Sequence, residues 1–177
     1  FLAENGIPVP EVVSVSIPDR MLIERFIDGI SVLDLISETM NKELLTEVQE
    51  HWASEIGRLI AHVHSLNVVL GDCKPENLII GNDGKIYAVD LEQGERNGDA
   101  SWDIAEFLHF SGHFGTRFSG GFRQFVKAFI KGYLTIGDPQ TLRKAASVKY
   151  SKIFLAWTPM PMIQGIVEQL QQVKCPV

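Results

Sequence analysis

The sequence is poor in cysteine, carries no excess of positive charge and has no long apolar run. Its 177 residues include two cysteines, too few for a disulfide framework, which favours a reducing, cytoplasmic compartment. Sixteen Lys and Arg against 22 Asp and Glu give a net charge of −6, so no chain-wide cationic surface exists, although a local basic patch stays open. No stretch predicts a membrane span or a signal peptide. We therefore expect neither a membrane nor a nucleic-acid partner.

The remaining composition is that of a folded domain, with 45% hydrophobic and 21% charged residues. Its first part is rich in β patterns. Residues 12–17 alternate apolar with polar side chains, residues 21–27 predict a second strand, and Pro18-Asp19-Arg20 forms the turn between them. Asp28-Gly29 is expected to end this β segment.

Helical periodicity dominates after Ser31. Residues 31–66 predict helix, and a single buried stripe is formed by Ile56, Leu59, Ile60 and Val63. A helix over 102–110 follows, with Ser101 as its expected N-cap. Further helices are predicted over 122–133, 139–157 and 162–173, so the fold class is α+β with a mainly helical second part.

A short island of polar residues lies between these helical stretches. Apolar residues 78–80 and 86–89 predict a β-hairpin with a four-residue turn. Antiparallel pairing places Asn77, before the first strand, beside Asp90, after the second. An amide oxygen and a carboxylate suit Mg²⁺, which keeps much of its shell for water and phosphate. Asp72 would serve as a base for an incoming hydroxyl, and Lys74 would offer charge to a transferring phosphate.

A resemblance to the protein-kinase superfamily rests on the run Gly-Asp-Cys-Lys-Pro-Glu-Asn at 71–77 and on Asp90. It implies that Asp72 is the catalytic base, that Lys74 is the loop lysine near the transferred phosphate, and that Asn77 and Asp90 are the metal ligands. It also implies that Asp103 is the helix-borne aspartate that supports the catalytic loop through backbone N–H groups.

Upstream, Leu-Ile-Glu-Arg-Phe-Ile-Asp-Gly at 22–29 resembles the strand and hinge that hold adenine in these kinases. The resemblance implies that backbone groups of Glu24 and Phe26 meet the purine, with Ile23 as gatekeeper and Ile79 as the floor of the site. The implied cofactors are ATP and Mg²⁺.

Departures from the eukaryotic pattern narrow the resemblance. Leu70-Gly71-Asp72 stands where His-Arg-Asp is usual, and Asp90-Leu91-Glu92 stands where Asp-Phe-Gly is usual. The short gap from Asp90 to Asp103 leaves no room for a long activation segment. These features are similar to RIO-like atypical kinases and to the small kinase of the KEOPS complex, and also to aminoglycoside- and choline-type kinases.

The 177 residues contain no Gly-rich loop and no strand lysine before the hinge. We therefore expect residues 1–27 to be a remnant of a kinase N-terminal lobe, residues 28–177 to be the helical C-terminal lobe, and this chain alone to be inactive. The intact protein is expected to phosphorylate a hydroxyl as an atypical Ser/Thr kinase, and a partner within a protein complex is compatible with this resemblance. The alternatives are a small-molecule kinase and a pseudokinase scaffold without turnover.

Two further patterns have simpler explanations. Cys73, beside Asp72, lacks a base placed by sequence and is expected to be a buried structural residue. His109 and His113 have a metal-like spacing, but Gly112 lies between them and no further ligand is evident, so we expect no zinc site there.

Overall fold

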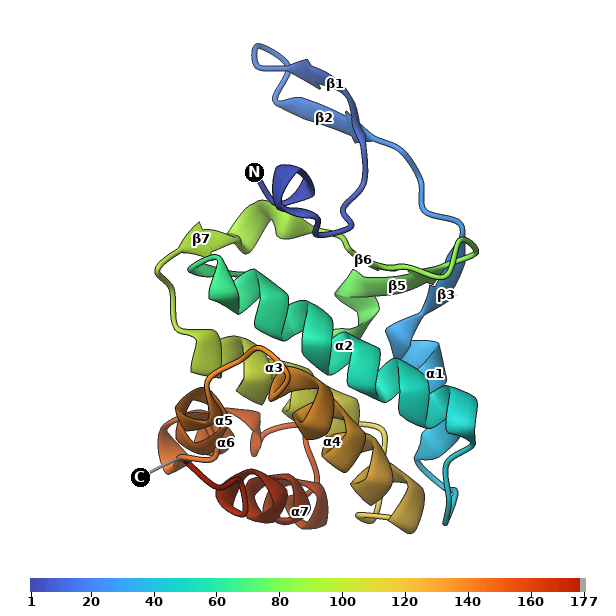
Figure 1. The fold of residues 1–177 in the computed structure, drawn as a ribbon, viewed down its shortest axis with the longest axis vertical. Helices are drawn as coiled ribbons and strands as arrows, with labels where there is room; N and C mark the ends of the chain where they lie inside the picture. Colours follow the sequence, from blue (N-terminus) through green and yellow to red (C-terminus); the bar gives the residue numbers. More distant parts are fainter. Residues whose placement is uncertain (176–177) are drawn as a thin grey trace.

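The computed structural model describes residues 1–175 and confirms an α+β fold with a mainly helical body (Figure 1). The helices are α1 (Val32–Thr39), α2 (Glu47–Ser65), α3 (Ala100–Gly112), α4 (Gly120–Tyr133), α5 (Pro139–Ala145), α6 (Val148–Phe154) and α7 (Met160–Gln171). The strands are β1 (Val12–Ser16), β2 (Met21–Glu24), β3 (Gly29–Ser31), β4 (Val68–Val69), β5 (Leu78–Gly81), β6 (Ile86–Ala88) and β7 (Glu95–Arg96). Short 3₁₀ turns cover Ala3–Asn5, Pro75–Asn77 and Leu91–Gln93.

β1 and β2 form the predicted antiparallel hairpin, which extends away from the helices in Figure 1. The second strand ends at Glu24, three residues earlier than predicted. Apolar side chains of this hairpin, including Val13 and Leu22, are exposed. The preceding segment behaves differently, because Ile7 is buried in the main core and Ala88 N–H donates to the Pro8 carbonyl. The division of the chain at residue 27 stays a prediction.

A third strand follows the hairpin where the β segment was expected to end. β3 pairs antiparallel with β5, in the register Gly29 with Gly81 and Ser31 with Ile79. Glycine is needed at position 29 because a Cβ there would clash with the backbone oxygen of Ile80. The prediction that Asp28-Gly29 ends the β segment was wrong, because Gly29 begins a strand that completes the sheet β3-β5-β6.

Helices α2 and α4 cross at close range and form the centre of the body. Thr46 begins α2 with a capping box completed by Gln49, and Ser119 caps α4. The approach is possible because two glycines lie at the crossing: a Cβ on Gly57 would meet the Phe129 carbonyl oxygen, and one on Gly132 would meet the Ser54 carbonyl oxygen. The helical structure predicted over residues 31–66 is formed by two helices, α1 and α2, which are separated by residues 40–46.

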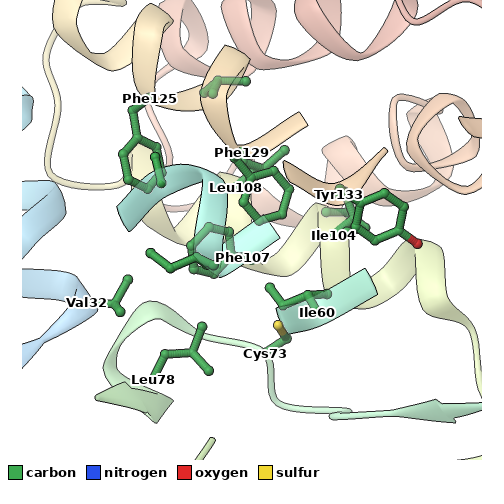
Figure 2. Close-up of a cluster of buried hydrophobic side chains, with 14 of the residues drawn as sticks. Val32, Ile60, Cys73, Leu78, Ile104, Phe107, Leu108, Phe125, Phe129 and Tyr133 are labelled. Atoms are coloured by element: carbon green, nitrogen blue, oxygen red, sulfur yellow. The ribbon is translucent and has the colours of Figure 1, made fainter. Parts of the chain in front are cut away.

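The N-cap of α3 is Asp99, whose carboxylate accepts from the Ser101 backbone N–H. The prediction of Ser101 as N-cap was wrong: Ser101 is buried within the first turn, and Asp99 is also held by Tyr150, Lys144 and Lys149. The side chains of α3 enter one continuous core with those of α2 and α4. Figure 2 shows part of it, with Phe107 and Leu108 between the aromatic rings of α4 and Ile60 of α2.

Candidate active site

The polar residues singled out from the sequence lie on one loop, residues 70–77, which we call the acidic loop. It connects β4, which pairs with β7, to β5, and it ends in the 3₁₀ turn Pro75–Asn77. Leu70, Cys73 and Pro75 are buried along it, whereas Asp72 and Lys74, on either side of Cys73, are only partly buried. The loop is therefore fixed on the body by its apolar residues and presents its charged ones on the other side.

Asp103 of α3 holds the beginning of this loop. Its side chain is fully buried, and its two oxygens accept hydrogen bonds from the backbone N–H groups of Leu70 (2.7 Å) and Gly71 (3.0 Å). These contacts match the arrangement implied by the kinase resemblance. A carboxylate that accepts two backbone N–H groups fixes the loop strongly, because removing it would leave buried donors unpaired.

His64 and Tyr133 extend this network, and sequence reasoning missed both. His64 Nε2 lies 3.0 Å from Asp103 Oδ2, and His64 Nδ1 lies 2.9 Å from the Tyr133 hydroxyl. Burial raises the pKa of Tyr133 to about 12, so its phenol keeps its proton. In a neutral imidazole, this phenol donates to Nδ1, and the hydrogen on Nε2 then points at Asp103. The C-terminal ends of α2 and α4 are thereby joined to the loop.

Asp72, Lys74 and Asn77 are in direct contact. Lys74 Nζ lies 2.6 Å from Asp72 Oδ1, and the Asn77 side-chain amide donates to both the carbonyl oxygen (2.9 Å) and Oδ2 (3.2 Å) of Asp72. The hydrogen bond with Asp72 raises the pKa of Lys74, which stays charged. The structure thus places a carboxylate, a cation and an amide together on one partly exposed surface.

Asp90 lies close to this group through the hairpin. Val89 N–H donates to the Asn77 carbonyl, so Asp90 follows the residue opposite Asn77. Asp90 is exposed and has a left-handed backbone (φ 55°), and its carboxylate accepts no hydrogen bond within residues 1–175. Because the amide nitrogen of Asn77 is engaged by Asp72, its oxygen is the atom that could bind a cation beside the Asp90 carboxylate. Two oxygen donors suit Mg²⁺, which takes its other ligands from water or phosphate.

The predicted purine contacts are not assembled around the acidic loop. Ile23, Glu24 and Phe26 lie in or just after the projecting hairpin, where Phe26 is 87% exposed. Ile79 lies on β5, half-buried and paired with Ser31 and Tyr87. No hydrogen bond or ion pair joins the three hinge residues to the loop within the described chain. Their role as a nucleotide site stays a prediction.

Two more residues of α3 contact the loop and were not found from sequence. Glu106 Oε2 accepts a 2.7 Å hydrogen bond from Cys73 N–H, and Trp102 Nε1 donates to the Gly71 carbonyl oxygen at 3.2 Å. Burial raises the pKa of Glu106 to about 7. A signal existed, since Glu106 lies one helical turn beyond Asp103 and faces the same side of α3. Cys73 is buried as predicted, and burial raises the pKa of its thiol.

Two negative observations concern the described residues 1–175. None of the helices there is long and apolar enough to span a bilayer. The same residues hold no cluster of three or more His, Cys, Asp or Glu side chains arranged as a metal site.

A helical body that carries this loop, and a hairpin flanked by Asn77 and Asp90, define a protein of the protein-kinase-like superfamily. The family model described as the lipopolysaccharide kinase (Kdo/WaaP) family matches residues 2–133, and the chain belongs to this family.

Curated relatives match shorter segments. The "Probable serine/threonine-protein kinase BUD32 homolog" of Archaeoglobus fulgidus is 34% identical over 86 residues, which cover 49% of this chain and 36% of the relative. The "cAMP-dependent protein kinase catalytic subunit 3" of Drosophila melanogaster is 32% identical over 59 residues, covering 33% of this chain and 10% of the relative. The "Serine/threonine-protein kinase Sgk1" of Rattus norvegicus is 39% identical over 54 residues, covering 28% and 13%. The chain thus spans about a third or less of the length of these relatives.

Proposed function

We propose that the protein containing this chain transfers the γ-phosphoryl group of ATP to a hydroxyl group. The observation that carries the proposal is the contact of Asp72 with Lys74 and Asn77, on a loop whose backbone is held by Asp103. A carboxylate on a fixed loop can orient an acceptor hydroxyl and take its proton, and an adjacent lysine can stabilise charge on the transferred group. Membership of a kinase family supports the same reaction class.

Asn77 and Asp90 would hold Mg²⁺. When bound, the ion would neutralise charge on the nucleotide phosphates. The chain's own contribution is positional, because most of the barrier to phosphoryl transfer is lowered by alignment and by fixed charges. In this proposal Asp72 must leave its contact with Lys74 or share it, so that one carboxylate oxygen reaches the acceptor while the other remains with Asn77.

Two classes of acceptor have support. A saccharide hydroxyl is favoured by the family description, whose model matches the larger part of the chain. The similarity to the archaeal BUD32 homolog favours a serine or threonine hydroxyl as the acceptor. The same similarity supports the proposal that the protein is a RIO-like kinase. We favour the saccharide acceptor because the family match extends over α4, whereas the relatives match shorter stretches.

The test is phosphate transfer by the intact protein from γ-labelled ATP with Mg²⁺. One arm offers lipopolysaccharide or its core oligosaccharide, and the other offers a protein acceptor such as casein. Label in the saccharide arm alone supports the favoured acceptor, and label in the protein arm alone overturns that choice but keeps the kinase proposal. Nucleotide binding without transfer to any hydroxyl acceptor would contradict the proposal and favour the pseudokinase alternative.

A further inference from the structure

Helix α3 contacts the acidic loop through four side chains. Asp103 accepts from the N–H groups of Leu70 and Gly71, Trp102 donates to the Gly71 carbonyl oxygen, and Glu106 accepts from Cys73 N–H. Lys74 Nζ lies 5.4 Å from the centre of the Phe110 ring. Asp103, Glu106 and Phe110 are three and four positions apart, which is the spacing of one helical face, and Trp102 is four positions before Glu106. The face therefore runs alongside the loop and touches it from Leu70 to Lys74.

Glu106 contacts the loop at Cys73, which lies between the charged residues Asp72 and Lys74. Cys73 separates Asp72 from Lys74, so the position of its backbone sets where both neighbouring side chains begin. Its side chain is 1% exposed and lies beside Ile60 in the core, as Figure 2 shows. The peptide that joins Asp72 to Cys73 is held on both sides: its carbonyl oxygen accepts from the Asn77 amide at 2.9 Å, and its N–H donates to Glu106 Oε2 at 2.7 Å.

The buried carboxylate of Glu106 destabilises the fold when it is charged. Glu106 is only 5% exposed, and this burial is the main reason that its pKa is raised; the carboxylates of Asp72 and Asp103 disfavour its charge further, whereas the Cys73 N–H and Lys74 partly offset these effects. A buried acid beside two others costs stability. Core packing would not require it, since an apolar side chain could fill the same space. The Cys73 N–H needs an acceptor at this distance, and a side chain of the length of Glu106 supplies one.

We propose that Glu106 is a positioning residue, which fixes the Cys73 peptide and thereby sets the relative placement of the Asp72 carboxylate and the Lys74 ammonium for phosphoryl transfer. This inference rests on the proposed kinase function, and it adds a residue that contacts neither substrate nor metal. The proposed role requires a hydrogen-bond acceptor at the correct distance from Cys73 N–H, and it does not require a negative charge.

The experiment compares E106A, E106D and E106Q in the intact protein, with E50Q on the exposed face of α2 as the control. Glutamine keeps both the reach and an acceptor oxygen, so E106Q is expected to stay within threefold of wild-type kcat. Aspartate keeps the charge but is one methylene shorter, so E106D, like E106A, is expected to lose ten- to a hundredfold in kcat. The KM for ATP should change less than threefold in all of them, and E50Q should match wild type.

A second readout does not depend on activity. In a C175S background, the rate at which Cys73 reacts with a thiol reagent reports opening of the loop. E106A and E106D should raise this rate at least tenfold, whereas E106Q and E50Q should leave it near wild type. If wild type transfers no phosphate but the thiol rates follow this order, the proposed function fails and the fixing of the Cys73 peptide stands.

Two results would overturn the proposal. A kcat and a thiol rate of E106D that both equal those of wild type would show that the reach of the side chain is irrelevant and that Glu106 does not position the loop. A loss of activity in E106Q as large as that in E106D would show that the charge of Glu106 is what matters. Should E106A fail to fold, the aspartate and glutamine variants still decide the question.

Discussion

Replacing His109 with leucine is expected to stabilise the chain, and the gain should grow as the pH falls. His109 lies on α3 with no exposed surface, and its ring stacks on Phe154 with 4.8 Å between ring centroids. Within residues 1–175 neither ring nitrogen has a hydrogen-bond partner. A buried donor and a buried acceptor left unpaired cost roughly 1–3 kcal/mol. Since lost stacking offsets about 1 kcal/mol of this, the net gain at pH 8 should be about 1 kcal/mol.

Protonation supplies the pH dependence. Burial lowers the pKa of His109 to about 4, from an ordinary value of 6.5. The unfolded chain therefore takes up a proton near pH 6.5, whereas the folded chain does so only near pH 4. The free energy of unfolding is therefore unaffected by this titration above pH 6.5, and it declines as the pH falls toward 4. At pH 5 the wild-type loss is about 2 kcal/mol, so the advantage of the leucine variant should rise to about 3 kcal/mol.

Denaturant unfolding of both proteins at pH 8, 6.5 and 5 measures this difference directly. Other groups, such as Glu106, titrate in both proteins and cancel when the two free energies are subtracted. The matched control is His51→Leu, because His51 is exposed on α2. A difference between H109L and wild type that is the same at all three pH values would refute the claim that His109 is held neutral by burial.

Three further outcomes are expected. Asp103→Ala should lower the free energy of unfolding by roughly 3 kcal/mol in denaturant titration, because two loop N–H groups lose their acceptor; an unchanged midpoint would argue against this contact. Gly132→Ala should cost at least roughly 2 kcal/mol, since its Cβ would clash with the Ser54 carbonyl and separate α2 from α4. Glu106→Gln should be more stable than wild type by roughly 3 kcal/mol at pH 8 and nearly equal at pH 4. The sign follows because a raised acid pKa gives stability that is complete below the ordinary value of 4.5 and is lost as the pH rises through about 7.

Local patterns predicted the elements that form from neighbouring residues. The β5–β6 hairpin follows from two short apolar runs and a Gly-Asn-Asp-Gly turn, and α4 follows from its apolar periodicity. β3 was missed because its three residues become a strand only by pairing with β5, about fifty positions later in the chain. The α3 N-cap was misplaced because Asp99 and Ser101 are both good caps, and the choice depends on Tyr150 and two lysines from distant helices.

The residues of the candidate site could likewise be found from the sequence only where they are neighbours along the chain. The acidic loop could be found because its chemistry is contiguous in the sequence, from Asp72 to Asn77. His64 could not be found, since a histidine on a helix gives no sign that it faces Asp103 across the core. Glu106 lay within reach of sequence reasoning, because its spacing from Asp103 places both on one face of α3, but only the folded loop shows that Cys73 N–H needs an acceptor.

Asp72 and Asp90 are proposed to serve phosphoryl transfer, and this proposal is tested by single-turnover transfer of γ-labelled phosphate by the intact protein. Asp72→Asn is expected to reduce the rate of transfer about 100-fold or more with little change in ATP affinity, because it removes the base and not the nucleotide contacts. Asp90→Asn is expected to abolish transfer and to weaken Mg²⁺ dependence, since it removes a metal ligand. Asp83→Asn is the matched control, because Asp83 lies in the turn of the same hairpin and pairs with Lys85. Transfer at the wild-type rate by folded Asp72→Asn or Asp90→Asn protein would contradict the account.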